Sequence, residues 1–178
     1  NVKNILVEHC VLWNAEPGNA VEIGYEVRCD EISDITFRDL DIVHCEYEGN
    51  QSGGVLTIHN ADRAHIHDIV YEDIRVEDAQ EKFVDIKVLD SKYSLDRKRG
   101  SVENIYFRNV EILNGNFPVS IIRGFEMHTE MSRPRNIYFD NVVVLGKQVE
   151  SPSDLHMVVE LSDDILFNGT AHAKRNPF

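Results

Sequence analysis

Several features that identify common protein classes are absent from this chain of 178 residues. No run reaches the roughly 18 consecutive apolar residues of a membrane-spanning helix, so we expect no membrane partner. The sequence has no phosphate-binding loop, serine nucleophile elbow or dinucleotide-binding glycine motif, and we expect no cofactor. No basic and then apolar segment opens the chain, so we expect any export signal to lie outside residues 1–178.

Basic residues and cysteines are also scarce. The chain has 18 Lys and Arg against 31 Asp and Glu, and its net charge of −13 with scattered cations argues against nucleic acid as a partner. Its three cysteines, Cys10, Cys29 and Cys45, form neither an even framework nor a C-x-x-C pair. Because Cys10 occupies a repeat position that is otherwise aliphatic, we expect it to pack as a small hydrophobic residue.

Five copies of a short pattern are present instead. Each copy is built around Asn or Asp followed by Ile, alternates with apolar β-forming residues, and ends with Asn, Asp or His. The copies span residues 2–9, 32–39, 66–73, 102–109 and 134–141. Their anchors, which lie 30 to 36 residues apart, are Asn4, Asp34, Asp68, Asn104 and Asn136. A repeat of this length with the alternation of a β-strand is typical of a stacked solenoid.

Each repeat contains a second run of alternating apolar and polar residues. These runs cover residues 20–23, 55–58, 83–88, 119–122 and 157–161. Neither run buries its apolar face alone, whereas stacking the repeats pairs equivalent strands in parallel around one core. We therefore predict an all-β fold, a right-handed parallel β-helix of about five coils over residues 1–162.

The last residue of the short pattern forms a polar column, which consists of His9, Asp39, Asp73, Asn109 and Asn141. Stacked amide and carboxyl groups at a bend bond to neighbouring coils and to turn backbone. We interpret this column as an internal structural ladder, so that Asp39 and Asp73 are not candidate catalytic acids.

The repeats are interrupted by two polar excursions and end in an irregular tail. We expect the excursions, residues 89–100 and 123–135, to gather on one face, as insertions in solenoids do. Residues 163–178 are expected to cap the last coil through Ile165, Leu166 and Phe167. The first coil has an open strand edge, for which we expect either a preceding part of the polypeptide or self-association through that coil.

The outward face of the second strands holds the candidate functional residues. Alternation predicts one column of Glu22, Thr57, Asp85, Ser120 and Glu160. Glu22 and Asp85 would lie two coils or ~9.6 Å apart, close to the upper end of the roughly 6.5–9.5 Å separation of an inverting glycosidase. A solvated acidic face explains the same residues without any catalysis.

A second outward column joins His59 to Lys87 beside Gly24. With Tyr25 and Trp13, these side chains suit contact with a neutral carbohydrate, although Trp13 fits equally well as a packed corner residue. His65 and His67 lie two residues apart on a strand and point to the same side. No third ligand accompanies them, so we expect no metal there and interpret them as polar surface residues.

The anchor repeats together with Asn19-Ala20-Val21-Glu22-Ile23-Gly24 and Gly54-Val55-Leu56-Thr57-Ile58-His59 resemble the C-terminal coils of pectin-lyase-fold glycoside hydrolases. The nearest likeness is to glycoside hydrolase family 28, the polygalacturonase family, with family 49 as a relative, and it covers most of residues 1–145. Asn19 stands where family 28 has a histidine, and Thr57 and His59 stand where it has arginine and lysine. The resemblance therefore implies a sugar-processing ancestry without the cations that grip a uronate.

The same resemblance places the catalytic aspartates on coils before residue 1. It implies that the chain is the C-terminal part of a polysaccharide-degrading enzyme that hydrolyses glycosidic bonds with inversion of configuration at the sugar carbon. The chain would then be inactive alone and extracellular or periplasmic. Its polysaccharide- or oligosaccharide-binding residues would be Asn19, Glu22, Tyr25, Thr57, His59, Asp85 and Lys87. The alternative is a non-catalytic β-helix that binds carbohydrate or serves in assembly.

Overall fold

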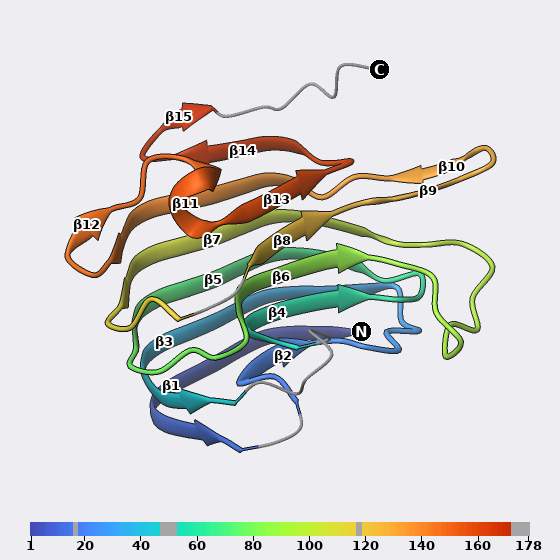
Figure 1. Ribbon diagram of the computed structural model, residues 1–178. Helices are drawn as coiled ribbons and strands as arrows, with labels where there is room; N and C mark the ends of the chain where they lie inside the picture. Colours follow the sequence, from blue (N-terminus) through green and yellow to red (C-terminus); the bar gives the residue numbers. More distant parts are fainter. Residues whose placement is uncertain (16–17, 47–52, 117–118, 172–178) are drawn as a thin grey trace.

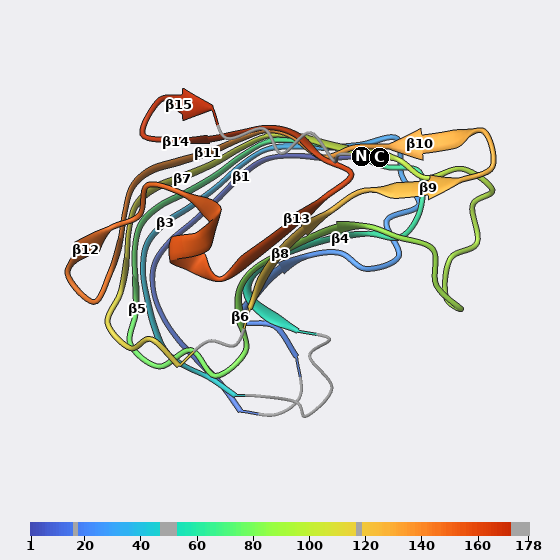
Figure 2. The ribbon, with the colours of Figure 1, turned by 45° about the horizontal axis from the view of Figure 1, so that its top comes forward.

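The computed structural model describes residues 1–15, 18–46, 53–116 and 119–171, and it shows a parallel β-solenoid of about four turns (Figures 1 and 2). Two parallel sheets enclose one hydrophobic core. Each coil contributes its first strand to one sheet and its second strand to the other, which confirms the predicted all-β parallel β-helix.

The long sheet contains the strands of the short repeated pattern. In spatial order it consists of β1 (Val2–Asn14), β3 (Glu31–Cys45), β5 (His65–Val76), β7 (Ser101–Ile112), β11 (Arg135–Val144), β14 (Asp163–Phe167) and β15 (Thr170–Ala171). All these strands are parallel to their neighbours except β15, which is antiparallel to β14. The strand β12 (Lys147–Gln148) adds an antiparallel partner to β11.

The short sheet contains the second runs of the repeats. It is formed by β2 (Val21–Ile23), β4 (Gly54–Asn60), β6 (Lys82–Val88), β8 (Ser120–Arg123) and β13 (Met157–Glu160). A 3-10 turn (Pro152–Leu155) precedes β13, and β9 (Phe125–Met127) and β10 (Glu130–Ser132) form a separate hairpin. None of the described residues forms a helix long and apolar enough to cross a membrane.

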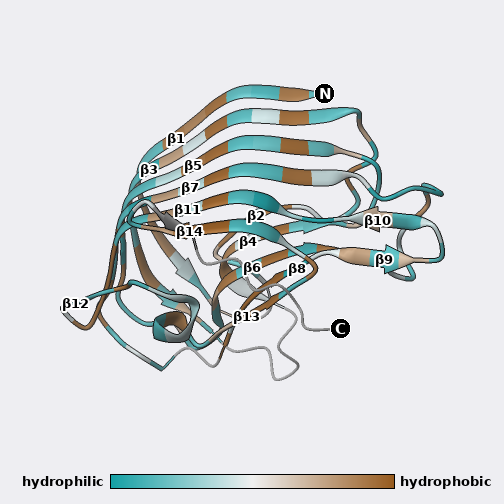
Figure 3. Cartoon of the chain, turned by 90° about the horizontal axis from the view of Figure 1, so that it is seen from above, coloured by the Kyte–Doolittle hydropathy of each residue, from teal (hydrophilic) through white to brown (hydrophobic). Residues whose placement is uncertain are grey.

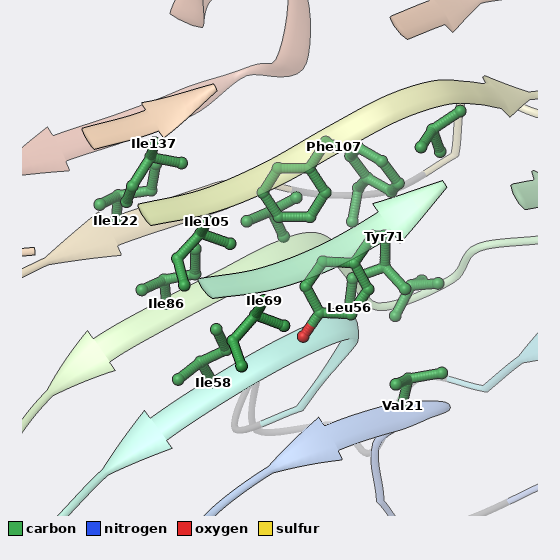
Figure 4. Close-up of a cluster of buried hydrophobic side chains, with 14 of the residues drawn as sticks. Val21, Leu56, Ile58, Ile69, Tyr71, Ile86, Ile105, Phe107, Ile122 and Ile137 are labelled. Carbon is green, nitrogen blue, oxygen red and sulfur yellow. The ribbon is translucent and has the colours of Figure 1, made fainter. Parts of the chain in front are cut away.

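The core is built from columns of like residues in register. Bands of equal hydropathy cross neighbouring strands of the long sheet (Figure 3). The Ile that follows each anchor forms one column, with Ile35, Ile69 and Ile105 at most 4% exposed. A parallel aromatic column stacks with ring centroids 4.7 to 5.2 Å apart, and part of it is seen in Figure 4. Its members are Phe37, Tyr71, Phe107, Phe139 and Phe167.

The anchor residues are Asn or Asp because the backbone there is left-handed. Asp68 has φ 54° and Asn104 has φ 56°, a region that these two residue types tolerate better than others with a Cβ. The polar column five positions later has the same backbone and is bonded from coil to coil: the amide of Asn141 donates to Asn109 (2.9 Å), and that of Asn109 to Asp73 (3.0 Å). The structural ladder is confirmed, but it lies on the surface rather than inside.

A sixth copy of the pattern lies in the segment that the sequence assigned to the tail. Asp164 has φ 53° like the other anchors, and Gly169, five residues later, has φ 78°. Ile165 and Phe167 continue the inward columns at 1% exposure each. The segment therefore extends the stack as β14 and at the same time closes the core; residues 172–178 lie outside the described residues.

The two excursions lie on the same side of the solenoid, as expected (Figure 1). The backbone N–H of Arg99 in the first bonds to Glu130 in the second. The hydroxyl of Ser132 donates to the carbonyl oxygen of Gly100. Cys10 pairs with Leu40 in the register and packs, partly buried, against the core, in the role expected for it.

Candidate functional site

The outward face of the short sheet holds a connected group of charged side chains. The observed column is Glu22, Thr57, Asp85, Ile121 and Val158. The expected places of Ser120 and Glu160 were wrong. A one-residue shift turns Ser120 inward, where its hydroxyl accepts the N–H of Val84. A two-residue shift leaves Glu160 facing outward but in the neighbouring column, beside Arg123.

His59 lies between two carboxylates from the coils on either side of it. Its Nδ1 is 3.1 Å from Oε1 of Glu22, and its Nε2 is 3.2 Å from Oδ2 of Asp85. Burial lowers the pKa of His59, but the two carboxylates raise it more, and the net direction is upward. A protonated imidazole hydrogen-bonds to Glu22 through Nδ1 and forms an ion pair with Asp85 through Nε2, so the three groups form one ionic chain across three coils.

Both carboxylates are held in their charged form. The hydrogen bond with His59 is the main cause that lowers the pKa of Glu22, against its partial burial. Burial raises the pKa of Asp85, but His59, Lys87 and Lys82 together lower it further. Neither group is therefore tuned as a general acid, which needs a raised pKa.

Two lysines complete the network on the other side of Asp85. Nζ of Lys87 lies 2.9 Å and Nζ of Lys82 lies 3.3 Å from Oδ2 of Asp85. Lys82 is fully buried and also pairs with buried Glu81 at 3.3 Å. Removing one partner from such a buried network leaves an uncompensated charge, which costs several kcal/mol. Three cationic and three anionic groups thus balance one another in the site.

Two short residues fix the geometry around Glu22 and His59. The side-chain oxygen of Asn19 accepts the N–H of Gly54 (2.7 Å) and the hydroxyl of Thr57 (3.1 Å), while its amide donates to Glu22 (2.7 Å). A Cβ on Gly24 would lie 2.8 Å from the backbone oxygen of His59, so that only glycine fits there. Because Gly24 has no Cβ, the backbone that follows β2 passes close to the backbone of β4 at His59.

Aromatic rings stand beside this network. Tyr25 meets His59 edge-on at 5.4 Å, and Tyr93 meets Tyr25 edge-on at 6.4 Å. Tyr93 belongs to the excursion 89–100, whose course is set by buried Asp62: its Oδ1 accepts the N–H groups of Leu95 (2.9 Å) and Asp96 (2.8 Å). Figure 2 shows this loop extending beyond the ends of β4 and β6.

The structure therefore brings all seven candidate residues together, but it gives them different exposure. Thr57, His59 and Asp85 are buried, whereas Glu22 and Tyr25 reach solvent and Lys87 does so in part. Trp13 is not part of this group, because its ring contacts His44 at 4.9 Å and is exposed. Sequence reasoning missed Lys82, Glu81 and Tyr93. Lys82 at the start of β6 could have been assigned to the site from the sequence only if the register of β6 against β4 had been known.

The histidine pair on the long sheet has a different environment. The rings of His65 and His67 lie 4.2 Å apart. His65 contacts Glu103 (2.7 Å), and His67 contacts Glu31 (3.2 Å) and Asp68 (2.6 Å). Among the described residues, no group of three or more His, Cys, Asp or Glu side chains is placed to hold a metal ion. The contacts with Glu103 and Glu31 link β5 to β7 and β3, the strands on either side of it.

Comparison with known proteins gives no match: no protein-family model, no curated protein and no solved structure matches the chain. The β-solenoid is therefore established by the structure alone. The likeness to glycoside hydrolase families 28 and 49 rests on the sequence motifs.

Proposed function

We propose that the chain is a carbohydrate-binding β-helix that supplies sugar-binding subsites to a polysaccharide-degrading glycoside hydrolase of the family 28 type. The observation that carries the proposal is the pair of tyrosine rings, Tyr25 and Tyr93, of which Tyr25 contacts His59 in the polar network. Aromatic surface with a few fixed polar groups is the usual composition of a site for small polar ligands. Such a function suits an extracellular or periplasmic protein.

The charges of the site favour a neutral sugar over a uronate. Lys87 is paired with Asp85, and the other outward cation of this column, Arg123, is paired with Glu160 at 2.7 Å. A carboxylate ligand would have to compete with these bonded carboxylates in a chain of net charge −13. Hydroxyl groups of a neutral sugar accept and donate without displacing either pair.

The same geometry argues against hydrolysis by Glu22 and Asp85. An inverting pair needs open space for water and substrate between its carboxyl groups. Here the ring of His59 occupies that space and contacts both carboxylates. Both carboxyl pKa values are lowered, so neither group is protonated to assist a leaving oxygen. We therefore assign binding to this chain and catalysis to a part outside it.

Calorimetric titration with neutral oligosaccharides of several linkages and with oligogalacturonate tests the proposal. We expect saturable binding of a neutral sugar, weakened about tenfold in Tyr25→Ala. Tyr138→Ala on the outer face of the long sheet is the matched control and should bind normally. No reducing ends should be released. Preference for oligogalacturonate, equal loss in both variants, or no binding of any glycan would refute the proposal.

A further inference from the structure

The two ends of the solenoid differ in how they finish the core. In the described part of the chain, β1 pairs only with β3, and its other edge carries free backbone groups. Ile5 in β1 is 39% exposed, whereas Ile35 one coil later is 4% exposed in the same column. The large exposed apolar residues of β1 are Val2, Ile5, Leu6, Val11 and Trp13. An uncovered edge with this much apolar surface is suited to pairing with a further strand.

In the described part of the chain, the far end of the stack offers a second copy only a partly covered edge for parallel, head-to-tail pairing. The strand at the far end of the stack is β14, and β15 covers the C-terminal part of its outer edge, with Leu166 paired to Ala171 and Phe167 to Thr170. This antiparallel strand disfavours head-to-tail growth of identical copies on the long sheet. The arrangement therefore favours a different segment as the parallel occupant of the β1 edge.

The charge pattern on the outer face specifies what that segment carries. One outward column alternates in sign from coil to coil, and Glu8 and Arg38 at its start form an ion pair. Its members are Glu8, Arg38, Glu72, Arg108 and Asp140. Opposite charges on facing strand positions stabilise a sheet, and like charges weaken it. A strand added before β1 should place a basic residue next to Glu8.

The anchor ladder adds a second requirement. The amide of Asn104 donates to Asp68 of the preceding coil, and the amide of Asn136 donates to Asn104, each at 3.1 Å. Asn4 has the same left-handed backbone, φ 58°, and its amide bonds to none of the described residues. The amide is placed to donate to an Asn or Asp of a preceding strand.

We propose that the edge of β1 binds a parallel β-strand of another polypeptide segment with the repeat's own pattern. That strand carries apolar residues in the columns of Val2, Ile5 and Val7, Asn or Asp next to Asn4, and Arg or Lys next to Glu8. Main-chain hydrogen bonds to the β1 edge provide affinity, and the two polar columns fix the register.

The single tryptophan provides the assay, because Trp13 lies at the end of β1 with 68% exposure. A synthetic peptide with the sequence of residues 101–114 places Asn104 next to Asn4 and Arg108 next to Glu8. Added to the intact chain, it should shift Trp13 emission to shorter wavelength in a saturable manner. The peptide with Arg108→Glu should bind about tenfold more weakly. The protein variant Glu8→Arg, checked for folding by circular dichroism, should reverse that preference.

Three results would overturn the proposal: no emission shift with either peptide, equal affinity of both peptides, or a shift that depends on protein concentration without peptide. The last would show that a second copy covers the edge. The peptide comparison alone tests the charge requirement if Glu8→Arg fails to fold. Sugar binding at Tyr25 is read by calorimetry, so either proposal can fail while the other stands.

Discussion

Tyr71 is the one member of the aromatic column that carries a polar atom, and its replacement by phenylalanine gives a direct test of the core. The side chain is fully buried between Phe37 and Phe107, as Figure 4 shows for its contact with Phe107. Its hydroxyl has no hydrogen-bond partner among the described residues, and burial raises its pKa strongly. A buried hydroxyl without a partner costs about 1–3 kcal/mol of stability. We therefore expect Tyr71→Phe to increase the free energy of unfolding by about that amount.

Equilibrium urea unfolding followed by far-ultraviolet circular dichroism measures this change. Each kcal/mol corresponds to a rise in Tm of about 2–4 °C for a chain of this size. Tyr106→Phe is the matched control, because the Tyr106 ring lies on the outer face against Tyr138, and its change should stay within about 0.5 kcal/mol. A loss of stability in Tyr71→Phe would mean that the hydroxyl is bonded in solution, and the reasoning about this column would be wrong.

Three further predictions concern the columns and the charged network. Ile105→Ala should cost about 2–5 kcal/mol in urea unfolding because Ile105 is fully buried, and Ile5→Ala at the open end should cost less than half as much; equal costs would contradict the open edge. Asn104→Ala should cost about 2 kcal/mol, because alanine tolerates φ 56° poorly and the bond to Asp68 is lost, whereas Asn104→Gly should cost less. His59 has a raised pKa, so its contribution to stability is present below its ordinary value of 6.5 and is lost as the pH rises through the folded value. The free energy of unfolding of the wild type should therefore decrease as the pH rises above 6.5, and this decrease should be smaller in His59→Gln. The same pH profile in both proteins would refute the assignment.

The fold was predictable because its determinants are local and repeated. The left-handed backbone at each anchor restricts the residue to Asn or Asp, and the following Ile and aromatic columns repeat with strand alternation. A reader of the sequence therefore recovers the stack from spacing alone. The sixth copy was missed because Asp164 and Gly169 keep the backbone pattern while its last position is glycine instead of Asn, Asp or His.

The candidate site was predictable only in part. Adjacent positions such as His59 and Lys87 were placed correctly because β4 and β6 stack without any shift. Ser120 was placed on the wrong face because one residue of slip in β8 exchanges the two faces, and nothing local in the sequence fixes that register. Tyr93 was missed for a different reason: its position depends on the long-range bonds of Asp62 to the excursion.

The proposed sugar face and the proposed strand-binding edge lie on the same end of the molecule. β2 is the outermost strand of the short sheet just as β1 is that of the long sheet, so Glu22 belongs to the open first coil. A strand that extends the stack beyond β1 would continue into a neighbour of β2 if it came from a complete coil, and would lengthen the face that holds Glu22 and Tyr25.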